Sequence, residues 1–127
     1  MLKIYKDNSD DLGFVIGCLF SQAINLCEFR LWVDSVIEKL PADLIPNYMF
    51  DLAGFDGHLF EISKIIGFVS SSKLSNDEKV SLSAIAYLRG ADVYDPPVTK
   101  EEALKALERN PNILERFKST FPFIKLN

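Results

Sequence analysis

The chain contains few histidines and cysteines, which are common metal ligands and catalytic residues. Among its 127 residues there are one histidine, His58, and two cysteines, Cys18 and Cys27. A structural zinc ion takes four ligands, mostly Cys and His, and no second Cys or His lies at ligand spacing from either cysteine. We therefore expect no metal and no other cofactor. Both cysteines are interpreted as small buried thiols of a reducing compartment.

The single histidine invites a catalytic interpretation because it follows Asp-Gly in the stretch "AGFDGHLFEISKII". A catalytic histidine requires a second group that activates or orients it. Asp56 is two residues away, and we expect it instead to cap a helix that His58 opens. Phosphate-binding loops, dinucleotide turns and nucleophile elbows are also missing. The sequence therefore predicts no catalytic residue, and we expect a protein that is not an enzyme.

Long apolar runs are missing as well. The best candidate, Leu12–Phe20, has nine residues, whereas a membrane-spanning helix needs roughly 20. The N-terminal segment is too acidic for a signal peptide. These features predict a cytoplasmic protein without a membrane partner.

Positive charge is scarce in the first half of the chain. Residues 1–64 carry five Lys/Arg against ten Asp/Glu, a net charge of −5, and residues 65–127 carry nine against eight, a net charge of +1. An acidic half is a poor binder of nucleic acid, because the phosphate backbone repels it. It suits a basic protein partner, since complementary charge speeds encounter.

Helical periodicity is the strongest positive signal. Apolar residues recur with helical spacing in two successive stripes: Leu12, Val15, Ile16, Leu19, Phe20 and Ala23, then Phe29, Trp32, Val33, Val36, Ile37 and Leu40. Because Trp32 lies centrally in the second stripe, we expect it in the core. Pro41 should end that helix.

The rest of the chain predicts further helices. A short one begins near Pro46 and ends near Ala53. The next spans residues 58–69, with Phe60 and Val69 on its apolar side. Ser75/Glu78 and Thr99/Glu102 form capping boxes that open two helices, and Asn110-Pro111 opens the last. We find no convincing strand. The prediction is an all-α fold: one compact, bundle-like domain of about seven helices over residues 1–127.

Two segments are candidates for partner binding. Asp92, Tyr94 and Asp95 lie beside two prolines in a stiff loop, which loses little entropy on docking. Asp51 and Asp56 flank a glycine-containing turn and extend the same predicted surface. The alternative is that these acids only cap helices and solvate the surface, with binding through the basic C-terminal segment around Arg116 and Lys118.

Three stretches resemble a known family: "EFRLWVDSVIEKL", "IPNYMFDLAGFD" and "ALKALERNPNILERFKSTFPF". They are similar to the small, helical, acidic immunity proteins of bacterial contact-dependent growth inhibition systems. The resemblance implies a cytosolic, non-catalytic monomer that binds one cognate toxin, often a nuclease, in a 1:1 complex. The alternatives are a helical adaptor or structural domain with another protein partner and, third, an enzyme that uses scattered carboxylates.

Overall fold

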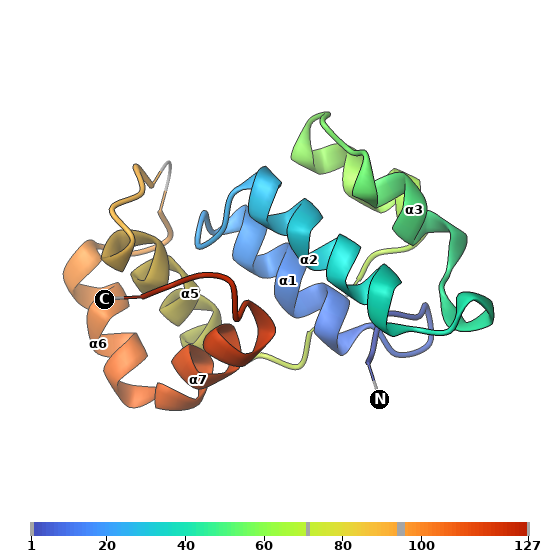
Figure 1. Ribbon diagram of the computed structural model, residues 1–127. Coiled ribbons are helices and arrows are strands. Elements are labelled where there is room, and N and C mark those ends of the chain that lie inside the picture. Colours follow the sequence, from blue (N-terminus) through green and yellow to red (C-terminus); the bar gives the residue numbers. More distant parts are fainter. Residues whose placement is uncertain (1, 71, 94–95, 127) are drawn as a thin grey trace. The chain divides into compact units, whose positions relative to one another are not determined.

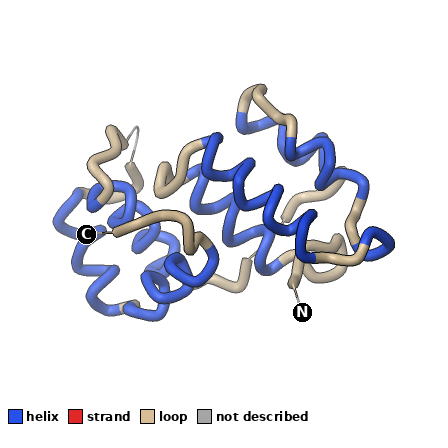
Figure 2. The backbone as a smooth tube through the Cα atoms, viewed as in Figure 1, coloured by secondary structure: helices blue, strands red, loops and turns tan. Residues whose placement is uncertain are grey.

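The computed structural model describes residues 2–70, 72–93 and 96–126, most of which lie in helices. Seven α-helices and two short 3-10 helices are present in these ranges, and no strand occurs there beyond one isolated bridge between Tyr5 and Asn8. The predicted all-α class is confirmed (Figures 1 and 2). The chain forms two compact units, Met1–Ile16 with Asn25–Ser72 and Gly17–Ile24 with Lys73–Asn127. The prediction of one domain over residues 1–127 stays a prediction.

The first unit contains most of the short helices. Its elements are the first residues of α1 (Asp10–Phe20), then α2 (Leu26–Lys39), η1 (Ala42–Leu44), α3 (Asn47–Ala53), η2 (Leu59–Glu61) and α4 (Ile62–Ile66). Asn25 opens α2 with a reciprocal capping box, in which its side chain accepts from the Glu28 N–H at 2.8 Å. Helix α3 packs against α2 and against α4 (Figure 1).

The core of the first unit is formed by the apolar face of α2 and the helices beside it. Trp32 is only 4% exposed, so its predicted core position is confirmed. Met49 and Leu52 of α3 and Ile62 of α4 are also buried. The N-terminal segment is held by the hydroxyl of Tyr5, which donates to the carbonyl of Leu44 at 2.7 Å. Tertiary packing thus compensates for helices too short to be stable alone.

The helix predicted over residues 58–69 is shorter than expected. It consists of η2 and α4 and ends at Gly67, whose φ of +81° is left-handed and suits glycine. Val69 therefore lies beyond the helix and is 85% exposed, and Phe60 is 67% exposed. Asp56 does not cap η2. His58 precedes its first residue, and the Glu61 carboxylate accepts from the His58 N–H at 3.2 Å.

The second unit is built on α5 (Asn76–Leu88), α6 (Lys100–Arg109) and α7 (Pro111–Thr120), which pack on one another (Figure 1). Both predicted start signals are used. Ser75 forms the predicted capping box with Glu78, and the Thr99 hydroxyl accepts from the Glu102 N–H at 3.2 Å. Residues 81–86 of α5 are all buried and mostly Ala or Ser. Such small side chains allow close approach of α6, which buries Ala103 and Ala106.

Two further expectations about burial need correction. Cys18 is buried, and burial raises the pKa of its thiol, whereas Cys27 is exposed. Cys27 is the second residue of α2 and lies opposite the face that buries Phe29 and Val33. Phe20, the last residue of α1, is 53% exposed although its spacing matches the buried stripe. Periodicity identifies the apolar face of a helix but not which part of that face a neighbour covers.

Candidate partner-binding surface

The charge imbalance of the sequence coincides with the two structural units. Residues 17–24 and 65–72 contain no charged side chain. All ten acids and five bases of residues 1–64 therefore fall in the first unit, which has a net charge of −5, and the second unit has +1. The acidic character thus belongs to one compact body.

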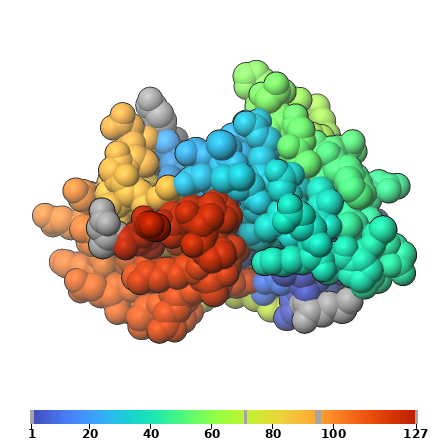
Figure 3. All heavy atoms as spheres, viewed as in Figure 1, coloured from blue at the N-terminus to red at the C-terminus, as the bar shows by residue number. Residues whose placement is uncertain are grey.

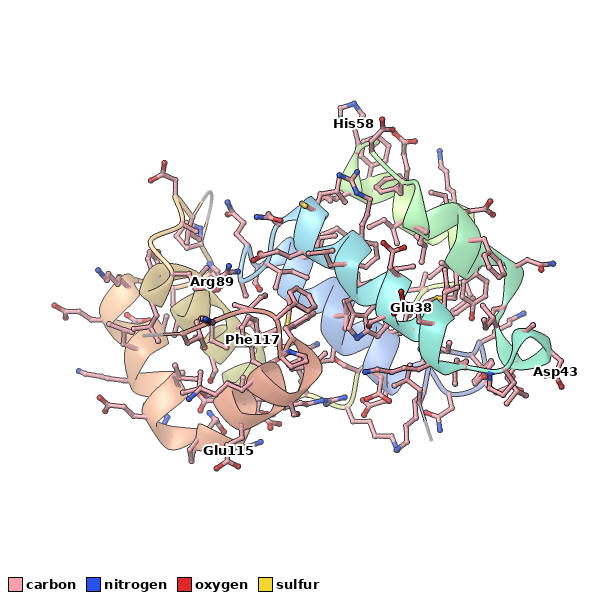
Figure 4. The ribbon with its side chains drawn as sticks, viewed as in Figure 1. Glu38, Asp43, His58, Arg89, Glu115 and Phe117 are labelled. Atoms are coloured by element: carbon pink, nitrogen blue, oxygen red, sulfur yellow. The ribbon has the colours of Figure 1, made fainter. Side chains whose placement is uncertain are left out.

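The outer side of α2 combines apolar and acidic residues. Its exposed positions Leu31, Asp34 and Glu38 follow one another at intervals of three and four, so they form one stripe opposite the buried face. Leu31 is 47% exposed. Glu38 is labelled in Figure 4 on this helix. On α3, the outer side carries Phe50, which is 52% exposed, and Asp51.

We call these five residues, Leu31, Asp34, Glu38, Phe50 and Asp51, the acidic face. It lies on two helices that pack together, and Figure 3 shows atoms of α2, in blue to cyan, beside the green atoms of later residues. Asp34, Glu38 and Asp51 form no ion pair or side-chain hydrogen bond with any other residue that the structure describes. Their charges are therefore available to a partner.

The predicted site residues are divided between the two units. Asp51 and Asp56 are exposed on the first unit. Asp92 is exposed on the second, where its backbone carbonyl accepts from the Gln22 side-chain amide at 2.7 Å. Tyr94 and Asp95 lie outside the described residues. The joint surface predicted for both segments stays a prediction.

Sequence reasoning missed the apolar part of the acidic face and the exposure of Phe60. Leu31 could have been found, because it lies outside the apolar stripe of α2 and therefore had to face away from the core. Phe60 could not, since its spacing also fits the buried face of a longer helix. Large exposed apolar residues are informative where they lie together, because such patches mark interaction sites.

The turn between α3 and η2 is fixed to α2. The Arg30 guanidinium of α2 donates from Nη1 to the carbonyl of Phe55 at 2.7 Å, and Phe55 itself is buried. Beyond this anchor, the His58 and Phe60 rings stack with centroids 5.5 Å apart and planes 7° apart. His58 lies at the tip of the turn in Figure 4. Two exposed aromatic rings are thus held on a turn whose base is anchored.

Two acids of the second unit, Asp77 and Glu78, form hydrogen bonds within that unit. The Asp77 carboxylate accepts from Arg109 at 2.7 and 3.2 Å and from the Asn110 amide at 2.7 Å. The hydrogen bonds from Arg109 and Asn110 lower the pKa of Asp77. The pKa of Glu78 is also lowered, first by its bond with the Ser75 backbone and then by Asn112.

One residue of the basic C-terminal segment, which was the alternative binding site, also interacts within the second unit. The positive charge of Arg116 contributes to lowering the pKa of Glu78. Lys118 is exposed on α7. Of the two residues named for this alternative, Lys118 is exposed and Arg116 is only partly exposed. The segment therefore offers a weaker basis for a charged interface than the first unit does.

The described residues contain no group of three or more His, Cys, Asp or Glu side chains that could hold a metal ion. In the same ranges, no helix is both long enough and apolar enough to cross a membrane. No family model matches the chain, and no curated protein or solved structure matches it at a significant level.

Proposed function

We propose that this protein is an immunity protein that binds and neutralises a cognate toxin with a basic surface, such as a nuclease, without catalysing a reaction. The observation that carries the proposal is the acidic face, where acids without a partner among the described residues lie beside the exposed side chains of Leu31 and Phe50 on a unit of net charge −5. The resemblance to helical immunity proteins supports the same function. The proposed complex is 1:1 and forms in the cytoplasm.

The acidic face suits such a partner for two physical reasons. A nuclease must present a positive surface to its substrate, because phosphates dominate nucleic-acid affinity. Opposite charges on the inhibitor steer the encounter, and apolar side chains buried at the centre then slow dissociation. Leu31 and Phe50 provide apolar area next to the acids Asp34 and Asp51. Binding by this face would cover the toxin surface that nucleic acid needs.

The test is whether this protein rescues bacterial growth from the proposed toxin. The polypeptide encoded by the neighbouring open reading frame is induced in bacteria with and without this protein, and growth is measured. We expect growth arrest without it and recovery with it. Purified components should then form a 1:1 complex by size-exclusion chromatography with light scattering. If the neighbouring polypeptide arrests growth and this protein neither rescues it nor binds that polypeptide, the proposal is wrong.

A further inference from the structure

We propose that the His58–Phe60 ring stack is a docking platform for an arginine side chain of a basic protein partner, with the Asp56 carboxylate available to pair with the guanidinium. The inference rests on the proposed function for the basic character of that partner. It adds a specific contact at a turn where sequence analysis predicted a helix cap and, at Asp56, one acid of the partner-binding surface.

The ring geometry is that of a platform rather than of a core contact. The two rings are nearly parallel, with planes 7° apart and centroids separated by 5.5 Å. Phe60 is 67% exposed and His58 is exposed. A flat guanidinium stacks readily on such rings, because it is weakly hydrated and is attracted by the π system. Lysine has a compact, strongly hydrated charge and stacks less well.

The platform is held in position from both sides of the turn. Before it, Arg30 of α2 donates to the Phe55 carbonyl at 2.7 Å. After it, the Glu61 N–H donates to the His58 carbonyl at 2.9 Å, and the Glu61 carboxylate accepts from the His58 N–H at 3.2 Å. A prearranged site loses less entropy when it binds.

The surrounding charge favours a cation. Asp56 is exposed and forms no ion pair or side-chain hydrogen bond with another described residue. The Glu61 carboxylate belongs to the same turn, where it accepts from the His58 N–H. Both lie in the unit with a net charge of −5. A guanidinium stacked on the rings would therefore bind at a turn whose acids favour a cation over a neutral or acidic side chain.

The experiment compares two probe peptides of equal charge, one of alternating arginine and glycine and one of alternating lysine and glycine. Binding to the ¹⁵N-labelled protein is followed by NMR. We expect the arginine peptide to bind about two- to fivefold more tightly, with the largest shift changes at residues 56–61. Phe60→Leu, which keeps an apolar side chain without the ring, should remove this preference. Val69→Ala, an exposed change in the same unit, should keep it.

The outcomes are separable from those of the proposed function. Equal affinity for the two peptides, undetectable binding of both, or a preference that survives Phe60→Leu would each overturn the platform. Because residue 60 is exposed, the Phe60→Leu variant should fold, and circular dichroism checks this. If the variant does not fold, the comparison of the two peptides on the wild-type protein still tests the platform. A wild-type protein that rescues growth but shows no preference for arginine overturns the platform alone.

Discussion

The acidic face of the first unit and the start of α5 in the second unit use their acidic residues in opposite ways. In the second unit, Asp77 is bonded by Arg109 and Asn110, and Glu78 by Ser75 and Asn112. In the first unit, the acids of the acidic face have no partner among the described residues, and large apolar side chains are exposed near them. Acids bonded within a unit contribute to its own stability, whereas unpaired acids do not.

This difference suggests a division between stability and recognition. Unpaired like charges repel one another and destabilise a compact state, although they keep it soluble. A unit that keeps them uncompensated, with Phe50 and Phe60 exposed as well, has a surface better suited to a partner than to isolation. The second unit has a nearly neutral balance, and its acids Asp77 and Glu78 have their partners within the unit. The following tests can break or sharpen this comparison.

The largest effect is expected from Phe117→Ala in the second unit. Phe117 is fully buried and its ring lies 4.9 Å from that of Phe121. Its truncation should lower the free energy of unfolding by about 3–5 kcal/mol, because it removes apolar contacts and leaves a cavity. Denaturant titration by circular dichroism measures this loss. Phe20→Ala, at a position that is 53% exposed, is the control and should cost less than about 1 kcal/mol.

The same variant tests whether the units unfold together. Trp32, the only tryptophan, lies in the first unit, so its fluorescence reports on that unit alone. Helix α1 runs without interruption from residues of the first unit into residues of the second. We therefore expect Phe117→Ala to shift the fluorescence and dichroism transitions equally. A fluorescence transition that stays at the wild-type midpoint would contradict the predicted single domain.

Much of the second unit could be predicted from sequence because its signals are local. Ser75, Thr99 and Pro111 mark the starts of α5, α6 and α7 at the residues where the structure has them. Each signal acts through backbone groups within one turn. The charge imbalance was also visible in the sequence. Segments 17–24 and 65–72 belong to different units than the rest of their halves of the chain, but they carry no charge. The two halves therefore have the same net charges as the two units.

The binding surface was less predictable because exposure depends on distant packing. The stripe over residues 58–69 included Phe60 and Val69, but the helix ends at Gly67, which leaves Val69 beyond it, and Phe60 lies exposed on the short η2. Cys27 has apolar neighbours in sequence but lies on the outer side of α2. Which side of a short helix is covered depends on neighbours far along the chain, and no local pattern encodes that.

A smaller effect is expected from removing two charges from either unit. Asp34→Asn with Asp51→Asn acts on the acidic face, and Glu108→Gln with Glu115→Gln makes the same net change on exposed positions of the second unit. With the cognate basic toxin at low salt, the first pair should lower the association rate constant on the order of threefold to tenfold, because steering depends on nearby opposite charge. Stopped-flow measurements at two salt concentrations should show the effect fading as salt rises.

The second pair serves as the matched control for net charge. It should change the association rate constant less than the first pair does. Equal losses for both pairs would mean that only total charge matters, and a larger loss for the second pair would place the interface on that unit. Either result would end the assignment of recognition to the first unit.

The smallest effect concerns the acid sensitivity of the Asp77–Arg109–Asn110 network. The pKa of Asp77 is lowered in the folded state by its bonds with Arg109 and Asn110. The folded state therefore binds fewer protons than the unfolded chain in acid. The stabilisation is complete above the unfolded carboxyl pKa of about 4 and is lost as the pH falls through the lower folded value. Because the Arg109 and Asp77 side chains are 58% and 45% exposed, solvent screening keeps the contribution small.

Asp77→Asn should therefore reduce the denaturant midpoint near pH 7, and the difference from wild type should shrink as the pH falls below about 4. Glu108→Gln on α6 of the same unit, outside this network, is the control and should show no such convergence. The difference shrinks in acid because only the wild type has a carboxylate at position 77. Protonation of that carboxylate abolishes its pair with Arg109, whereas the Asn variant has no such pair to lose. A difference that stays constant from neutral to acidic pH would show that the pair contributes no charge-dependent stability. Asp77 would then resemble the acids of the acidic face, which do not stabilise their own fold.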